Sequence, residues 1–398
     1  MANEFYIKED IKVEMYLPVA NTGVWNFSKW NSGDDWMAST GFAWTDVVAD
    51  VVSASIELGG TVEQGYAAPA TPNVMNLVMQ STTYDPYNNP KIHPGTPIRF
   101  SYRQNPDTAP STYTVLFNGF IDNFDVSYEY HGLNTINIAA TSSLKRALNK
   151  VFTVWNPSSY ATNATAAEAL LYWCNLAGIT YSGTSPIVTG ARYALDYYND
   201  YDSGQGLEDI NQLEAGFFYQ KADDTLAWRT SDEIRYRIAN DSITNTFSNT
   251  HITAATHFCI SDIAFTYAAD NYWNQFKAIC ESSTSYTRTT SNQDSIDVMG
   301  LMALEKTLHI YPSYTDLDYW LSFVQLSYPT RQVSSITTPI IRQDATLANV
   351  SALLPTSLVN IAVTTPGYTI NDKSMITRAV HEITPENWIA TIELWKGL

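Results

Sequence analysis

Apolar and polar residues alternate along most of the chain, in short stretches separated about every ten residues by Gly, Pro, Asn, Asp or Ser. The alternation is clearest in residues 11–17, Ile-Lys-Val-Glu-Met-Tyr-Leu, and recurs in residues 98–102. Residues 114–128 and 134–140 show it on both sides of a turn at His131 and Gly132, as in a hairpin. A period of two places one set of side chains on a buried face and the other in solvent, so the pattern predicts short antiparallel strands.

Helical spacing is confined to a few segments. Residues 165–177 are rich in Ala and Leu, and Thr165 with Glu168 has the spacing of a capping box. We expect further helices over 203–213 and from 315 to about 327, before Pro329. The remaining predicted elements are a short serine-capped helix over residues 142–148, which would seal the end of a barrel, and a hairpin over residues 216–229 that turns at Asp223 and Asp224.

These elements divide the chain into three regions. Residues 1–150 are nearly all β, residues 151–245 alternate helix with hairpin, and residues 246–398 are β again with one helix. A weak internal echo links the outer regions, because residues 117–140 and 376–394 both read as strand, turn and strand, although unrelated hairpins also resemble one another. The predicted fold class is mainly β with an α/β insert: two small β-barrel domains flanking an α+β region.

Charge narrows the range of functions. The 398 residues include 22 Lys and Arg against 40 Asp and Glu, a net charge of −18 with only 16% charged residues. The length predicts two or three domains with sizeable cores. The imbalance comes from a scarcity of basic residues, and binding to nucleic acid depends on Lys and Arg displacing counterions. Sequence-specific binding to DNA or RNA is therefore excluded.

Cysteine usage and targeting signals point to an intracellular origin. Cys174, Cys259 and Cys280 are too far apart for a disulfide framework or a CxxC metal site, so we expect small buried hydrophobes. The first residues lack a basic region followed by an apolar core, and no run of roughly 18 apolar residues occurs. We expect no signal peptide, no transmembrane helix, and folding in a reducing cytoplasm.

The sequence offers no catalytic motif. It contains neither a GxSxG elbow nor a GxxxxGK[ST] loop, and Gly204-Gln205-Gly206 lacks the third glycine of a dinucleotide fingerprint. The histidines fall in turns or alternating strands, or lack a zinc-ligand spacing: His93, His131, His251, His257, His309 and His381. We predict no catalytic, cofactor-binding or metal-binding residues and no enzymatic activity.

Acidic pairs are the remaining candidates for chemistry, because two carboxylates at a cleft can hydrolyse a glycosidic bond. The pairs lie mostly in loops or turns: Asp34 with Asp35, Asp122 with Asp125, Asp200 with Asp202, and Asp223 with Asp224. The loop 197–206, Tyr-Tyr-Asn-Asp-Tyr-Asp-Ser-Gly-Gln-Gly, offers oxygen ligands for calcium but lacks the bidentate glutamate of an EF-hand. Calcium binding at this loop is left open.

Aromatic residues are numerous, with 26 Tyr, 11 Trp and 15 Phe. They can stack on sugars, but they also fill barrel cores and the buried centres of subunit interfaces. Because Trp25, Trp30, Trp36 and Trp44 crowd into one short region, we favour packing or assembly.

A series of short motifs runs in order along nearly the whole chain. It begins with Trp-Thr-Asp-Val at 44–47 and closes with a His-x-Ile-Thr-Pro-x-x-Trp hairpin within residues 380–388. The motifs between them are residues 55–60, 76–80, 84–90, 92–99, 116–122, 140–144, 214–219, 228–229 and 274–278. In their order and spacing, these motifs resemble the minor tail or tail-hub proteins of long-tailed bacteriophages. The chain departs from the family at 80–84, Gln-Ser-Thr-Thr-Tyr, where the usual loop carries a glycine.

The resemblance implies a structural virion protein, the hub of a tail tip or baseplate. Such a hub is a homotrimer in which two β-barrels per subunit alternate in a pseudo-sixfold ring, joining the sixfold tail tube to threefold tip components. The implied partners are the distal tail protein or tail-tube ring, the tape measure protein, and central fibre or receptor-binding tip proteins. The implied location is the virion tail tip after assembly in the host cytoplasm, with no cofactor.

The resemblance also implies a channel that DNA crosses during ejection. We expect some of the excess Asp and Glu side chains to line this channel, because carboxylates would repel the DNA phosphates and keep the DNA from binding. Two alternatives stay open at this point: a glycoside hydrolase that degrades cell-wall polymer, and a carbohydrate-binding receptor protein of the tail tip.

Overall fold

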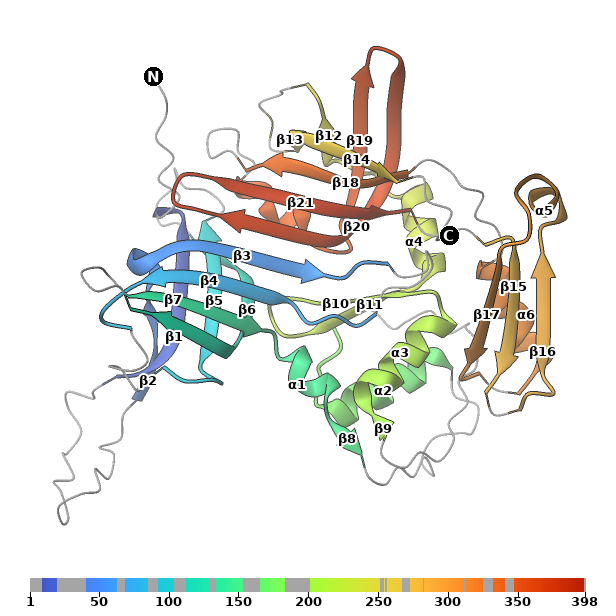
Figure 1. The fold of residues 1–398 in the computed structure, drawn as a ribbon, viewed down its shortest axis with the longest axis horizontal. Coiled ribbons are helices and arrows are strands. Elements are labelled where there is room, and N and C mark those ends of the chain that lie inside the picture. Colours follow the sequence, from blue (N-terminus) through green and yellow to red (C-terminus); the bar gives the residue numbers. More distant parts are fainter. Residues whose placement is uncertain are drawn as a thin grey trace. The chain divides into compact units, whose positions relative to one another are not determined.

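The computed structural model describes residues 9–19, 41–62, 69–84, 92–103, 112–128, 134–152, 165–182, 201–250, 254, 256–266, 273–281, 283–310, 312–324, 332–340 and 347–396 (Figure 1). Contacts within the chain form two compact units. Unit 1 comprises Met1–Ile56, Val74–Ser142 and Glu382–Asn387, and unit 2 comprises Glu57–Asn73, Ser143–His381 and Trp388–Leu398. Each unit is therefore assembled from segments that are far apart in the sequence.

Unit 1 is built mainly of β-strands. They are β1 (Ile11–Val19), β2 (Gly41–Asp46), β3 (Val51–Gly59, with its last residues in unit 2), β4 (Val74–Gln80), β5 (Pro97–Arg103), β6 (Tyr113–Ser127) and β7 (Thr135–Thr141). Their order is β3-β4-β7-β6-β5-β1-β2, and the neighbouring strands from β4 to β2 pair antiparallel. The predicted pairing of residues 114–128 with 134–140 is confirmed as β6 with β7.

The alternation over residues 11–17 is confirmed in β1, where every second residue is apolar and buried: Ile11, Val13, Met15 and Leu17. The intervening Tyr16 is exposed on the opposite face. In β6, Gly119 lies against β7 so closely that a Cβ atom would come 2.3 Å from the carbonyl oxygen of Thr141. This close approach explains the glycine in the segment 116–122.

The predicted helices and hairpin lie in unit 2, from Ser143 onward. Its first elements are α1 (Leu144–Leu148), β8 (Val151–Phe152), α2 (Ala166–Ala177), β9 (Tyr201–Asp202), α3 (Ser203–Leu213), β10 (Phe217–Gln220), β11 (Leu226–Arg229) and α4 (Ser231–Asn240). The capping box at α2 is confirmed: the Thr165 side chain accepts from the Glu168 backbone N–H, and the Glu168 side chain accepts from that of Thr165. Helix α4 was not predicted from the sequence.

A three-stranded sheet and two more helices follow: β15 (Gln275–Cys280), β16 (Thr287–Ser291), α5 (Gln293–Met299), β17 (Ala303–Leu308) and α6 (Tyr314–Val324). The strand order is β16-β15-β17, with β15 parallel to β17. Helix α6 confirms the helix predicted from residue 315, whereas α5 is an addition. One apolar cluster contains residues of α2, α3, β15, β17 and α6, including the buried Trp173 and Trp320.

This cluster includes side chains from both sides of residue 245, where the sequence suggested a domain boundary. The division of the chain into three domains, residues 1–150, 151–245 and 246–398, stays a prediction.

The remaining elements of unit 2 are β12 (Thr246–Ser248), β13 (His257–Cys259), β14 (Asp262–Thr266), β18 (Gln332–Pro339), the 3-10 helix η5 (Leu347–Leu353), β19 (Leu358–Thr365), β20 (Tyr368–Ile383, whose end lies in unit 1) and β21 (Trp388–Trp395). Strand β12 is parallel to β13 and β19, whereas β19 with β20 and β18 with both β14 and β21 are antiparallel. The fold is mainly β, as predicted. Among the described residues, no helix has the length and apolarity needed to cross a membrane.

Candidate functional site

In the part of the chain that the structure describes, no group of three or more His, Cys, Asp or Glu side chains is placed to hold a metal ion. Several sequence candidates lie outside the described residues: Asp34, Asp35, Asp200, His131, His251, Trp25, Trp30, Trp36 and the first part of the loop 197–206.

The two histidines at the ends of strands β17 and β20 are buried and neutral. Burial lowers the pKa of His309 and of His381 to about 4. Nδ1 of His309 lies 2.6 Å from Oε2 of Glu281, which orients the ring. By contrast, His93 is exposed in a turn, with Nδ1 3.0 Å from the Pro94 carbonyl oxygen. Neither buried imidazole is placed as an acid or base in an open cleft.

The Asp223 and Asp224 carboxylates hold the turn between β10 and β11. Asp223 accepts hydrogen bonds from the hydroxyl and the backbone N–H of Thr225, and these bonds lower the pKa of its carboxyl. Asp224 has φ +65°, burial raises the pKa of its carboxyl, and Oδ1 accepts from the Ser143 hydroxyl over 3.2 Å. These contacts give the pair a structural role.

Asp122 accepts a hydrogen bond from the Thr141 hydroxyl over 2.7 Å, between the neighbouring strands β6 and β7. Its predicted partner Asp125 lies farther along β6. The Asp122 carboxylate therefore makes a contact between two strands of the sheet.

None of the three cysteines, which all lie in the described part of the chain, forms a disulfide. Burial raises the pKa of the Cys174 thiol to about 12, and the buried Cys280 thiol donates to the Ile310 carbonyl oxygen over 3.1 Å. Cys259 is half-buried. The expectation of buried small hydrophobes is confirmed for Cys174 and Cys280.

The Trp-Thr-Asp-Val segment has a structural explanation at the end of β2. Oδ1 of Asp46 accepts from the Val48 backbone N–H over 3.0 Å, which starts the 3-10 helix η2 (Val48–Asp50). Val47 is buried, and its N–H donates to the Val13 carbonyl oxygen over 2.8 Å. The motif therefore turns the chain from β2 toward β3.

Unit 1 also presents an aromatic surface, which we define as Tyr16, Phe42, Trp44 and Arg99. The Tyr16 ring lies 5.5 Å from Phe42 and 5.3 Å from Trp44, measured between centroids. The Arg99 guanidinium stacks 4.2 Å above Trp44, and its Nε donates to Oε2 of Glu14 over 2.7 Å. Phe42 is 53% exposed and Tyr16 36%.

Strand β2, which carries Phe42 and Trp44, is the last strand in the order of unit 1 and pairs with β1 alone among the described residues. An edge strand with exposed aromatics is a typical site of protein association. Trp44 therefore fits the expected assembly role of the tryptophans.

The closing hairpin motif is confirmed in β20 and β21. The Thr384 N–H donates to the Asn387 carbonyl oxygen over 2.8 Å, and the Asn387 N–H donates to the Thr384 hydroxyl over 3.1 Å. At the base of the hairpin, Nε1 of Trp388 donates to Nδ1 of His381 over 3.2 Å. These bonds explain the spacing of His, Thr and Trp in the motif.

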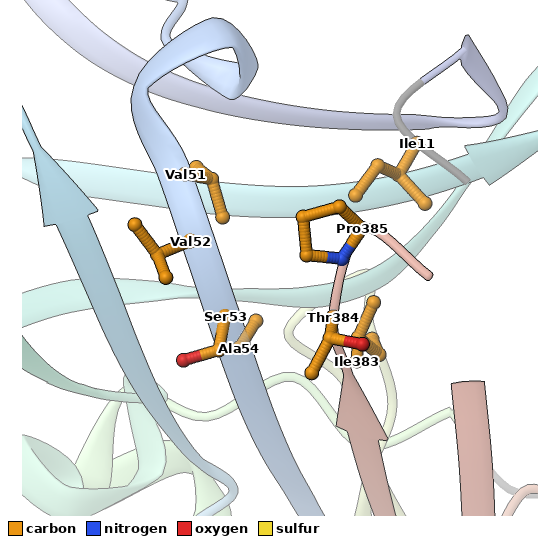
Figure 2. A pocket seen from close by; sticks show the side chains of 8 residues that line it. All are labelled: Ile11, Val51, Val52, Ser53, Ala54, Ile383, Thr384 and Pro385. Carbon is orange, nitrogen blue, oxygen red and sulfur yellow. The ribbon is translucent and has the colours of Figure 1, made fainter. Parts of the chain in front are cut away.

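The tip of this hairpin borders an apolar pocket in unit 1 (Figure 2). Figure 2 shows the Pro385 ring and the side chains of Ile11 and Val51 around it. The rest of the lining is Val52, Ser53, Ala54, Ile383 and Thr384, without a titratable group. The residues of this small pocket come from three separate segments that no sequence motif connects.

No family profile matches the sequence, and no curated protein matches it. Among solved structures, the 43 kDa tail protein of prophage MuSo2 from Shewanella oneidensis is similar, with a TM-score of 0.57 and 9% identity over 98% of both chains. A tail protein from Neisseria meningitidis matches with a TM-score of 0.58 and 9% identity, also over 98% of both chains.

A third similar structure is the prophage tail protein gp18 from Listeria monocytogenes, with a TM-score of 0.52 and 9% identity over 96% of this chain and 94% of that one. Across nearly its whole length, the chain therefore has the fold of these tail proteins. The fold expected from the resemblance is confirmed.

Proposed function

From the fold that the chain shares with phage tail proteins, we propose that it is a structural component of a bacteriophage tail and, within the tail, the hub of the tip or baseplate. The observation that carries this proposal is the match of almost the entire chain to two tail proteins, over 98% of each. The tail-hub motifs support the narrower assignment, because they occur in order from Trp44 to Trp388.

The proposed mechanism is assembly without chemistry. Three copies form a closed ring through heterologous contacts, in which one face of each subunit meets a different face of the next. The edge strand β2 and the aromatic surface beside it support such a contact. In the proposed ring, two β-rich parts of each subunit alternate around the axis and match the sixfold symmetry of the tube.

The proposed partners are the distal tail protein or tail-tube ring on one side and central fibre or receptor-binding tip proteins on the other, with the tape measure protein at the axis. The ring surrounds the channel through which DNA leaves during ejection. The net charge of −18 supports a lumen that repels the phosphate backbone, so that DNA passes without being bound.

The proposed location is the tail tip of the virion, after assembly in the host cytoplasm. Immunogold labelling of intact phage particles with an antibody against the chain tests this placement. Gold at the distal end of the tail agrees with a hub, whereas gold on the capsid or along the tube contradicts it.

A further inference from the structure

Unit 2 exposes an apolar projection at one end of its three-stranded sheet, where the chain passes from β16 to β17 (Figure 1). We call residues 292–302 the α5 knob. Val298 in this knob is 84% exposed, more than any other large apolar side chain of the described residues, and Leu301 is 60% exposed. A soluble fold gains nothing from placing these side chains together in water.

The buried side chain of Asn274 holds the α5 knob in one conformation. Its Nδ2 donates to the Gly300 carbonyl oxygen over 2.7 Å, and its Oδ1 accepts from the Met302 N–H over 2.8 Å. The backbone N–H of Asn274 donates to the Met302 carbonyl oxygen over 2.9 Å. On the other side of the knob, the Asn292 N–H donates to the Asn274 carbonyl oxygen over 2.8 Å.

These bonds attach both ends of the knob to one buried residue. A short helix capped by Asn292, whose side chain accepts from the Ser295 N–H over 3.1 Å, completes the arrangement. A projection that is already ordered loses little conformational entropy when it binds, so it is well suited to insertion into a pocket.

The charge around the knob limits the choice of partner. Asp294 and Asp297 are exposed, and the sequence from 289 to 304 contains no Lys or Arg. Asp297 accepts from the neutral Gln293 amide over 2.7 Å, so this contact leaves its charge uncompensated. Electrostatic complementarity therefore favours a partner whose pocket has basic residues at its rim.

The chain's own apolar pocket has acidic residues on both sides of one of its lining segments. Its lining segment, Ile383 to Pro385 (Figure 2), lies between the exposed Glu382 and Glu386. Acidic groups on both sides would repel the knob of a second copy. An anionic lipid surface would repel the knob for the same reason.

We propose that the α5 knob docks in an apolar pocket bordered by Lys or Arg on a different protein of the tail, with Val298 and Leu301 as its anchors. This inference rests on the proposed function, because it places the neighbour in the same particle.

The test uses phage particles in which a photo-crosslinking amino acid replaces Val298, with Tyr236 of α4, which is 67% exposed, as the matched control position. Irradiation is expected to join position 298 to one other tail protein, in a segment whose apolar residues are flanked by Lys or Arg. Crosslinks from position 298 to a second copy of the chain, to lipid, or to no protein would overturn the proposal.

A second measurement uses the partner that the crosslink identifies. Val298→Asp and Leu301→Asp are each expected to weaken its binding to the purified chain by about tenfold or more, whereas Tyr236→Asp leaves it unchanged. Thermal unfolding of the variants is expected to match that of the wild type, because both anchors lie outside the core. Equal binding by wild type and both anchor variants would overturn the proposal.

The two proposals fail differently. Tail particles that contain the chain but lack the crosslink at position 298 contradict the knob alone. Particles from which the wild-type chain is absent contradict the proposed function and, with it, the proposed neighbour.

Discussion

The indole N–H of Trp388 donates a hydrogen bond to Nδ1 of His381 over 3.2 Å, and both side chains are buried at the base of the closing hairpin. Because Nδ1 accepts this bond, the imidazole must be neutral and carry its proton on Nε2. A proton added to Nδ1 would remove the acceptor and place a charge in the core.

Acidification is therefore expected to destabilise the protein. Burial lowers the pKa of His381 and His309 to about 4 in the folded state, below the ordinary value near 6.5. The unfolded chain binds these protons first, so stability is lost as the pH falls from about 6.5 to about 4. Urea unfolding at pH 7.5 and at pH 5 measures the difference in the free energy of unfolding between the two pH values. We expect this difference to be smaller in His381→Gln than in the wild type. An unchanged free energy of unfolding in the wild type would contradict buried neutral imidazoles.

Asn274→Ala is expected to destabilise unit 2 by about 2 to 3 kcal/mol, because the Gly300 carbonyl and the Met302 N–H lose their side-chain partner. The matched control is Asn292→Ala, which removes one helix cap and is expected to cost about 1 kcal/mol. Hydrogen exchange at the Met302 amide should accelerate in the first variant more than in the second. Equal effects would show that Asn274 has no special role in holding the α5 knob.

Gly119→Ala is expected to destabilise unit 1 by about 1 to 3 kcal/mol, because its Cβ would come 2.3 Å from the Thr141 carbonyl oxygen and separate β6 from β7. Gly178 is a useful contrast: it ends α2 with φ +76°, and a Cβ there meets nothing within 4 Å. Gly178→Ala should cost about 1 kcal/mol through backbone strain alone. Chemical denaturation compares the free energies of unfolding of the two variants. An unchanged free energy of unfolding in Gly119→Ala would contradict the close approach of β6 and β7.

Phe42→Ser tests the aromatic surface. With 53% of its side chain exposed, Phe42 adds little to the stability of the subunit, so the melting temperature should change little. Association of the subunits should weaken, and light scattering after size-exclusion chromatography measures the mass of the assembly. The control is Leu171→Ser on the exposed side of α2, which is expected to preserve the assembly. An unchanged mass for Phe42→Ser would remove this surface from the proposed subunit contact.

Local signals in the sequence were sufficient to predict several helices and strands. The Thr165 and Glu168 pair marks the start of α2, and the Asp223-Asp224 turn marks the hairpin of β10 and β11. The apolar stripe of helix α4 is short, with Ile234 buried and Ile238 packed against the same cluster, and α5 is too short to show a period. Both have a capping residue, Thr230 and Asn292, which was the available signal.

The candidate contact sites depend on long-range pairing and are harder to predict. Trp44 meets Tyr16 and Arg99 because of the registers of β1 with β2 and with β5, and a shift of one residue would move the rings to the other face. The parallel pairing of β15 with β17 requires the crossover that contains the α5 knob. No local pattern specifies either pairing.

The central claim is that the chain is a tail hub, and reconstruction of the tail tip by electron cryomicroscopy tests it most directly. We expect three copies of the chain in a closed ring on the tail axis, each contributing two β-rich parts to a pseudo-sixfold layer around an open channel. Six copies per ring, an open stack along the tube, or a monomer attached off the axis would contradict the account.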